Sequence, residues 1–199
     1  AGPAGNQTAL KLASSGHNVT VVDYRTRPGD KLCTGIVGRE CFEAYRVPQE
    51  MVLQEARSAR FITAGANHIQ IQRQHAQAYV IDRVRFVSHI AERAAGAGAR
   101  YITGGLVNAI EVSADSVSVG LTLNGKRQNL QARCIVVASG AGSKMAEMAG
   151  LSPARKLAYA SQTVVESPHS SEVSVMLPGV LPSGHFGWLV SQGEGRALL

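Results

Sequence analysis

Apolar and polar positions along the chain follow two different periods. In residues 6–15 and 83–96, apolar side chains recur three and four residues apart, which predicts two amphipathic helices. A two-residue alternation in residues 59–82 predicts antiparallel strands around Gly65–Asn67. The same alternation in residues 106–132 predicts three more antiparallel strands, with Asn124–Gly125 as the type I′ turn of a hairpin. The last fifty residues also have strand-like patterns.

Short β-branched runs predict buried parallel strands in residues 18–24 and 133–140, and a further short strand in residues 100–104. Residues 40–56 indicate a short helical region that Pro48 interrupts. Together these elements predict an α/β fold, with a Rossmann-like parallel sheet, a β-meander in its crossover and part of a second, antiparallel sheet. A meander at this place favours an FAD-binding domain over one that binds NAD alone.

The first 24 residues have the pattern of a dinucleotide-binding turn. Gly2 and Gly5 have the spacing of the second and third glycines of G-x-G-x-x-G, and the predicted strand ends at Asp23. Gly2 would let the backbone approach a pyrophosphate, and the acid could accept hydrogen bonds from ribose hydroxyls. An ordinary αβ unit with incidental glycines is the alternative, but the order of turn, helix, strand and acid favours the dinucleotide site. We therefore expect the chain to begin inside this motif and to be a fragment.

Composition limits the class of protein. With 45% hydrophobic and 17% charged residues, the chain is an ordinary globular protein. A net charge of +6 suits an anionic cofactor, a lipid headgroup or a nucleic acid. Scattered Lys and Arg and few aromatic residues argue against a nucleic-acid platform. Three cysteines without a C-x-x-C pair favour a reducing compartment, and the six histidines show no metal-ligand spacing. No apolar run approaches the roughly 20 residues that span a bilayer.

Five segments together resemble the FAD-dependent oxidoreductases of the geranylgeranyl reductase family, which have a para-hydroxybenzoate hydroxylase-like flavoprotein fold. The segments are GPAG with Asp23, KLCTGIVG, YVIDRVRFVSHIAERA, CIVVASGAGS and FGWLV. The resemblance covers essentially the whole chain and corresponds to the N-terminal half of such a protein. Two positions depart from the family pattern. Ser139 stands where the family usually has Asp, and Val190–Ser191 stands where the isoprenoid reductases usually have Phe-Pro.

The resemblance implies a set of site residues. The FAD-binding residues would be Gly2, Pro3, Ala4, Gly5, Asp23, Tyr24, Arg83, Ser139 and Gly140. Phe186 and Trp188 would line the substrate cavity, although a plain core role for Trp188 is as well supported. Cys33 would be catalytic, with its thiol facing the flavin or the substrate double bond, and an inert buried cysteine is the alternative. Cys41 and Cys134 are expected in the core and Arg85 on the surface.

The resemblance also implies a function. FAD would reduce carbon–carbon double bonds of a geranylgeranyl-type prenyl chain, and NAD(P)H is the expected reductant. The alternatives are an FAD-dependent monooxygenase of the same fold, or an electron-transfer flavoprotein that docks a quinone or a protein partner. The partner would be a small prenyl or lipid molecule and not a nucleic acid. We expect a cytoplasmic protein, with peripheral membrane contact left open.

The predicted domain organisation also follows from the resemblance to this family. Residues 1–60 and 79–150 would form the FAD-binding domain, without its first strand. Residues 61–78 and 151–199 would form part of the substrate domain. The oligomeric state stays open.

Overall fold

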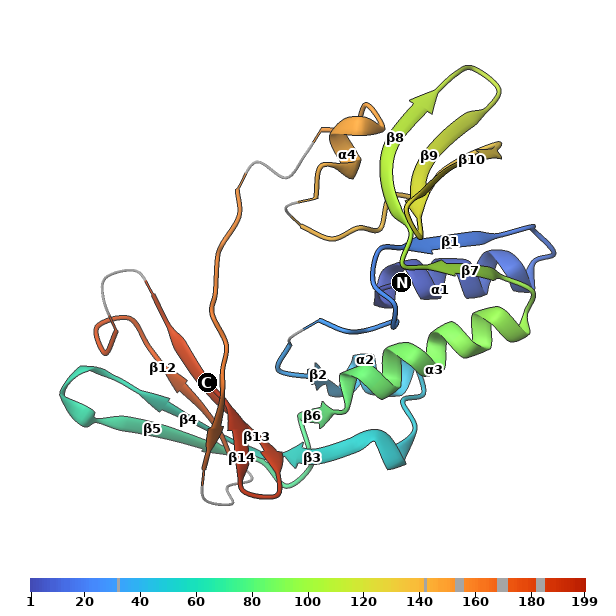
Figure 1. Cartoon of the computed structure of the whole chain (residues 1–199). Helices are drawn as coiled ribbons and strands as arrows, with labels where there is room; N and C mark the ends of the chain where they lie inside the picture. The colour runs from blue at the N-terminus through green and yellow to red at the C-terminus, as the bar shows by residue number, and fades with distance from the viewer. Residues whose placement is uncertain (32, 142, 153–155, 168–171, 182–184) are drawn as a thin grey trace. The chain divides into compact units, whose positions relative to one another are not determined.

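The computed structural model describes residues 1–199 apart from 32, 142, 153–155, 168–171 and 182–184 (Figure 1). Contacts between residues divide the chain into two compact units. The first unit contains residues 1–31 and 87–159, and the second contains residues 32–86 and 160–199. The chain has parallel and antiparallel sheets together with helices, which confirms the predicted mixed α/β class.

The first unit contains the predicted turn, helix and strand. Helix α1 (Pro3–Ser14) leads to β1 (Thr20–Asp23), which pairs in parallel with β7 (Arg100–Thr103). Helix α3 (Arg83–Gly96) belongs to this unit from Val87 onward. A small core joins the two helices through four buried alanines: Ala9, Ala13, Ala94 and Ala99. Small side chains at these positions let the helix backbones approach closely.

Helix α1 ends as its sequence predicts. Gly16 follows the last turn with φ +81°, a left-handed conformation that favours glycine. Its N–H donates to the carbonyl of Ala13 at 2.9 Å, and the N–H of His17 donates to Leu12 at 3.1 Å. These two bonds satisfy carbonyls that the end of a helix would otherwise leave without partners.

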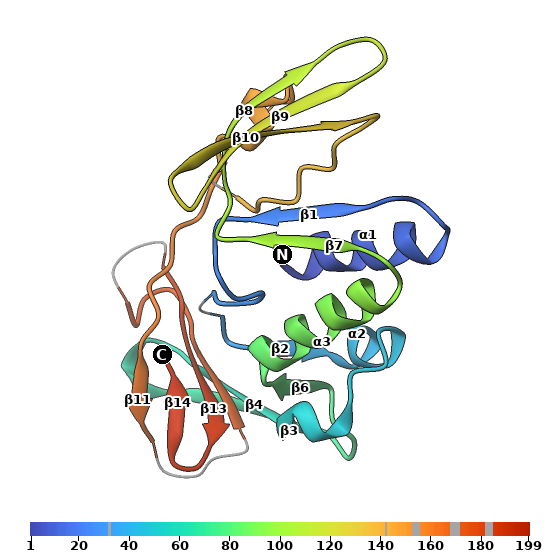
Figure 2. The same cartoon turned by 45° about the vertical axis from the view of Figure 1, so that its right-hand side comes forward.

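The predicted meander is present in the first unit (Figure 2). Strands β8 (Leu106–Val112), β9 (Val117–Leu123) and β10 (Lys126–Ala132) are antiparallel. Asn124 and Gly125 have φ values of 50° and 73°, as a type I′ hairpin turn requires. The short helix α4 (Met145–Met148) contributes Met145 to the apolar cluster on this sheet.

One predicted strand of the first unit is wrong. Residues 134–140 form neither strand nor helix, and Val136 is 56% exposed. A strand exists only through hydrogen bonds to a neighbour, and none of the strands in the described residues pairs with this segment. Cys134 is consequently exposed and not a core residue.

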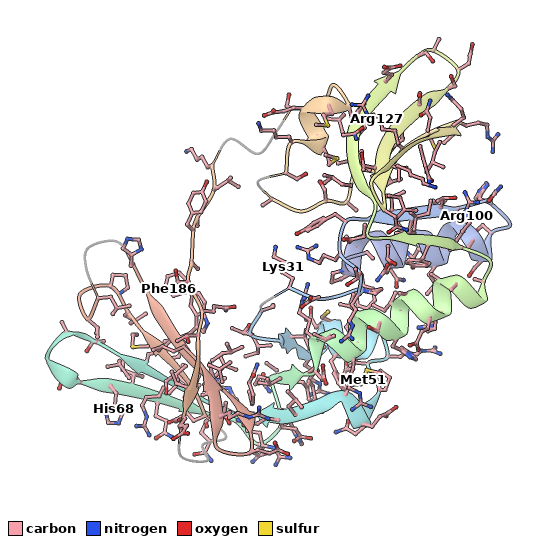
Figure 3. All side chains as sticks on the ribbon, in the orientation of Figure 1. Lys31, Met51, His68, Arg100, Arg127 and Phe186 are labelled. Carbon is pink, nitrogen blue, oxygen red and sulfur yellow. The ribbon has the colours of Figure 1, made fainter. Side chains whose placement is uncertain are left out.

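The second unit contains a small antiparallel sheet in the order β2-β6-β3. Its strands are β2 (Ile36–Gly38), β6 (Ala78–Ile81) and β3 (Val52–Ala56), and helix α2 (Arg39–Ala44) follows β2. Pro48 separates α2 from a 3₁₀ turn (Gln49–Met51) that precedes β3. No residue of α2 is buried, so the core prediction for Cys41 is also wrong. Val47, Met51 and Ile81 form the core beside this sheet (Figure 3).

A six-stranded sheet makes up the rest of the second unit, in the order β11-β14-β13-β12-β4-β5. Strands β4 (Ser58–Ile62) and β5 (His68–Gln72) form the predicted hairpin around a 3₁₀ turn (Ala64–Ala66). The other strands are β11 (Val164–Glu166), β12 (Glu172–Met176), β13 (Gly187–Gly193) and β14 (Arg196–Leu198). Strand β12 runs parallel to β4, and the remaining pairs are antiparallel.

The register of this sheet separates its side chains into two faces. Paired residues share a face, and so do residues two apart on one strand. The face that we call the apolar face carries Val164, Leu198, Val190, Trp188, Val175, Val173, Phe61, Ala59, Ile69 and Ile71. It also carries one charged pair, Glu166 on β11 and Arg196 on β14. The opposite face of β4, β5 and β12 carries mainly polar residues, among them Arg60, Gln70 and Glu172. The apolar face is buried at Val190 and exposed at Ile69.

The compact units do not follow the predicted domain boundaries. Residues 32–60 and 79–86 belong to the second unit, and residues 151–159 belong to the first. The physical reason is that strands of the two sheets in the second unit follow one another directly along the chain. Only Arg57 separates β3 from β4, so the two sheets of the second unit share one stretch of chain. The assignment of these ranges to cofactor or substrate stays a prediction.

Candidate functional site

The N-terminal turn of α1 has an open backbone side. Gly2 caps the helix in an extended conformation (φ −84°, ψ 179°), and the N–H of Asn6 donates to its carbonyl at 2.9 Å. A Cβ atom added to Gly2 would meet no heavy atom within 4 Å. A Cβ atom added to Gly5 would lie 3.4 Å from the Cβ of Ala138, so α1 rests closely on the segment at 134–140. Gly2 thus has open space beside its backbone and Gly5 lies at a close contact, while the binding of FAD by these glycines stays a prediction.

The first turn of α1 can bind an anion. A helix leaves its first N–H groups without intrahelical partners, and its N-terminus carries a partial positive charge. Pro3 stands at the first helical position and has no N–H. The N–H groups that this turn of the helix can donate to an anion are therefore those of Ala4 and Gly5. No acidic residue stands in this first turn to compete with a bound phosphate.

Asp23 lies beside the turn at the end of β1. Its side chain is 12% exposed, and it contacts the amino group of Ala1. Its Oδ1 accepts a hydrogen bond from the backbone N–H of Arg25 at 2.8 Å, and the Arg25 guanidinium lies 3.7 Å away. That guanidinium also lies 4.4 Å from the ring centre of Tyr24. The turn and the acid are thus neighbours, an arrangement that fits the ribose and diphosphate of a dinucleotide.

Ser139 and Gly140 directly follow Ala138, the residue that lies next to Gly5. Both are exposed. Gly140 has φ +82°, which favours glycine over any residue with a side chain. The first unit thus contains six predicted cofactor residues in Gly2–Gly5, Asp23 and Tyr24, and two more in Ser139 and Gly140. The ninth, Arg83, belongs to the second unit.

The loop that carries Cys33 lies in the second unit and contacts the end of β6. Cys33 is exposed and precedes β2. The N–H of Ile81 donates to the carbonyl of Gly35 at 3.0 Å, which joins the loop to the end of β6. Asp82 Oδ1 then accepts a hydrogen bond from the N–H of Arg85 at 3.0 Å and caps α3. Arg83, half-buried, is the first residue of that helix, as predicted, and Arg85 is exposed.

The predicted aromatic pair also lies in the second unit. The rings of Phe186 and Trp188 are 5.6 Å apart and inclined by 48°. Phe186 is 59% exposed and directly precedes β13, whereas Trp188 is partly buried on the apolar face. The indole Nε1 of Trp188 is buried and has no hydrogen-bond partner among the residues that the structure describes. An acceptor on a bound molecule could satisfy it.

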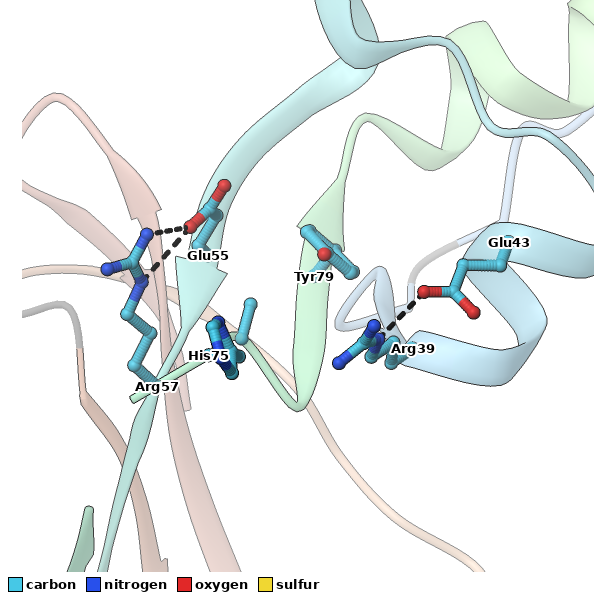
Figure 4. Close-up of a pocket in the computed structure, with 7 residues that line it drawn as sticks. Arg39, Glu43, Glu55, Arg57, His75 and Tyr79 are labelled. Carbon is cyan, nitrogen blue, oxygen red and sulfur yellow. Dashed lines mark hydrogen bonds and ion pairs between the residues drawn. The ribbon is translucent and has the colours of Figure 1, made fainter. Parts of the chain in front are cut away.

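A shallow pocket of about 220 Å³ lies elsewhere in the second unit (Figure 4). It is lined by Arg39, Glu43, Glu55, Arg57, His75, Ala76 and Tyr79. Each arginine pairs with its neighbouring glutamate at 2.7 Å, and the hydrogen bond to Glu43 raises the pKa of Arg39. The pocket contains none of the predicted site residues. Its lining comes from well-separated positions, so no local pattern in the sequence could have predicted it.

Sequence reasoning also missed Asn6, which is completely buried beside the turn. In the sequence it stands only as a polar residue before an apolar helical run. Its burial shows only in the structure, where a buried amide needs hydrogen-bond partners that fix its surroundings.

The fold defines a class of protein. The chain is similar to a solved geranylgeranyl bacteriochlorophyll reductase-like protein from Thermoplasma acidophilum, with a TM-score of 0.85 and 20% identity over 99% of this chain and 53% of the other. It is also similar to a flavin-dependent monooxygenase solved in complex with FAD and substrate, with a TM-score of 0.71 and 15% identity over 99% of this chain and 40% of the other. These likenesses show the fold of flavin-dependent oxidoreductases.

The family follows from the sequence. The profile of the pyridine nucleotide-disulphide oxidoreductase family matches residues 1–175, and the chain belongs to this family. The geranylgeranyl diphosphate reductase of Rhodobacter capsulatus is 24% identical over 99% of this chain and 51% of its own length. The chain thus spans about half the length of the curated relatives that it matches. Within the described residues, no helix is both long enough and apolar enough to cross a membrane.

Proposed function

We propose that the full-length protein is an FAD-dependent oxidoreductase that reduces carbon–carbon double bonds of a geranylgeranyl-type prenyl chain. The observation that carries this proposal is the apolar face of the six-stranded sheet. Its apolar residues come from all six strands, and its two charged side chains, Glu166 and Arg196, are paired across β11 and β14. A prenyl chain is a long hydrocarbon, and contact with such a face would remove its apolar surface from water. The relative from Rhodobacter capsulatus is named for the reduction of a geranylgeranyl compound.

The first unit would hold the adenosine diphosphate part of FAD. The amides of Ala4 and Gly5 would donate hydrogen bonds to the diphosphate, and Gly2 would let its oxygen atoms approach the backbone. Asp23 would accept hydrogen bonds from the ribose hydroxyls, in place of its contact with the Arg25 guanidinium. Arg83 in the second unit would contact the cofactor as well. A bound FAD supplies the ring that accepts and donates hydride.

Reduction of a double bond needs a hydride at one carbon and a proton at the other. We propose that the Sγ–H of Cys33 provides this proton, because the thiol is exposed on a loop next to the start of α3. Phe186 and Trp188 would orient the substrate, with the unpartnered indole N–H of Trp188 available to an oxygen atom of its headgroup. NAD(P)H would regenerate the reduced cofactor.

A second candidate function is a monooxygenase reaction. The solved flavin-dependent monooxygenase that shares this fold favours it, because the fold serves both chemistries. The two functions differ in what reoxidises the reduced flavin. A reductase passes electrons to the prenyl double bond, whereas a monooxygenase passes them to oxygen when a small polar substrate is bound.

A single-turnover experiment separates these functions. The purified full-length protein is reduced without oxygen and mixed in a stopped-flow apparatus with geranylgeranyl diphosphate or with para-hydroxybenzoate. The proposal predicts flavin reoxidation by the prenyl compound alone in the absence of oxygen, with the saturated product found by mass spectrometry. Reoxidation that needs oxygen and is stimulated by the aromatic acid would instead establish the monooxygenase. Reoxidation by a quinone alone would indicate an electron-transfer flavoprotein.

A further inference from the structure

Asn6 is a completely buried polar side chain whose hydrogen bonds all lie within the first unit. Its Nδ2 donates to the carbonyl of Ala1 at 3.2 Å and to the carbonyl of Val87 at 3.1 Å. Its Oδ1 accepts a hydrogen bond from the hydroxyl of Tyr101 at 3.1 Å. Burial raises the pKa of that hydroxyl, which keeps it protonated as the donor. The amide therefore has defined partners for both N–H groups and for its oxygen.

We propose that Asn6 is a positioning residue that fixes the orientation of the phosphate-binding turn, an inference that rests on the proposed binding of FAD. Asn6 donates hydrogen bonds to the carbonyl oxygens of the two residues at the start of the turn, Ala1 and Gly2. Its side chain binds the oxygen of Ala1, and its backbone N–H binds the oxygen of Gly2 at 2.9 Å. Carbonyl oxygens carry partial negative charge and would repel a diphosphate. Asn6 thus keeps two repulsive groups directed back at the helix.

The geometry of the peptide bond extends this argument to the N–H of Gly2. No described peptide bond is cis, so the C=O and N–H of the Ala1–Gly2 peptide point in opposite directions. Since the oxygen of Ala1 points to Asn6, the N–H of Gly2 points away from Asn6. An added Cβ at Gly2 would meet no heavy atom within 4 Å, so this residue has open surroundings. The peptide next to glycine would otherwise rotate freely, and the side chain of Asn6 removes that freedom before the ligand binds.

The same side chain also joins α1 to α3 and β7, so a purely structural role must be separated from positioning. Tyr101→Phe removes the third hydrogen bond and leaves both carbonyl contacts of the turn. Asn6→Leu is similar in size and removes all three. Asn6→Leu alone leaves the Tyr101 hydroxyl without its acceptor, which costs stability. The double variant Asn6→Leu/Tyr101→Phe has neither the hydroxyl nor the amide and therefore does not have this cost. Of these two residues, Asn6 is the one whose side chain binds the Ala1–Gly2 peptide in the described structure.

The test measures the dissociation constant of FAD and the melting temperature for the full-length wild type and these three variants. We expect Tyr101→Phe to change FAD affinity by less than about 3-fold, and Asn6→Leu to weaken it by about 30-fold. The double variant should regain melting temperature relative to Asn6→Leu but not FAD affinity. Recovery of FAD affinity together with melting temperature would overturn the inference, as would wild-type affinity in Asn6→Leu. A wild type that binds no FAD would refute the proposed function itself.

A second measurement needs no folded Asn6 variant. Labelling alanine with ¹³C at the carbonyl and glycine with ¹⁵N selects Ala–Gly peptides in the NMR spectrum, and Gly2→Ala assigns the Ala1–Gly2 signal. The inference predicts that FAD moves the Gly2 amide proton downfield in the wild type, as a new hydrogen bond to phosphate would. An unmoved Gly2 signal in protein that has bound FAD overturns it.

Discussion

The backbone of Gly35 lies against the end of β6, where an added Cβ would come within 2.4 Å of the carbonyl oxygen of Ile81. Its φ of +72° is also a left-handed conformation that costs other residues energy. We expect Gly35→Ala to lower the free energy of unfolding by about 3 kcal/mol, through strain and overpacking together. Urea denaturation of the full-length protein measures this.

Gly38 offers a matched control three residues later. Its φ is −66°, and an added Cβ would meet no heavy atom within 4 Å. Gly38→Ala should therefore change stability by less than about 1 kcal/mol. Equal losses in both variants would show that the contact with Ile81 does not hold the Cys33 loop in place.

Cys33 provides the second prediction at the residue scale. If its thiol donates the proton, Cys33→Ser should keep FAD bound but slow reduction of the prenyl double bond by about 10- to 1000-fold. Reduction of the flavin by NAD(P)H should change little. Stopped-flow spectroscopy separates these two half-reactions. Cys41→Ser is the control, because Cys41 is also exposed but lies on α2. An unchanged half-reaction with substrate would mean that Cys33 is not the proton donor.

At the scale of elements, Asp82 fixes the start of α3 and hence the position of Arg83. Its carboxylate accepts the N–H of Arg85 at 3.0 Å, which satisfies one of the free amides of the first turn. We expect Asp82→Ala to lower the free energy of unfolding by about 1 kcal/mol, and Asp82→Asn to retain most of the stability. Asp115→Ala, in the turn between β8 and β9, serves as an exposed control. If Asp82→Asn loses as much as Asp82→Ala, the side-chain cap is not what stabilises α3.

The elements that the sequence predicts correctly carry local signals. Gly16 ends α1, and Asn124–Gly125 sets the hairpin, because each conformation depends on a few adjacent residues. The strand predicted in residues 134–140 failed because its β-branched composition says nothing about a pairing partner. The hydrogen bonds of Asn6 could not be predicted either, because their partners Val87 and Tyr101 lie 81 and 95 positions away from Asn6 in the chain.

At the scale of the whole molecule, the sequence predicts the class of fold, the family and a match to about half of such a protein, and the comparisons with known proteins agree on all three. The candidate site was predicted in pieces. The dinucleotide turn and Asp23 are neighbours in the first unit, and Cys33 and Arg83 both belong to the second unit. The apolar face was not predicted, because it depends on the register of six strands that are distant in the sequence.

The central claim is that the turn at Gly2–Gly5 and the acid at Asp23 bind FAD. The most direct test is the dissociation constant of FAD for the purified full-length protein, with its flavin content measured by absorbance. We predict a yellow protein with one FAD per chain, and an affinity that Asp23→Ala lowers by about 10- to 100-fold while Asp115→Ala leaves it unchanged. A colourless protein that cannot be reconstituted with FAD would contradict the account.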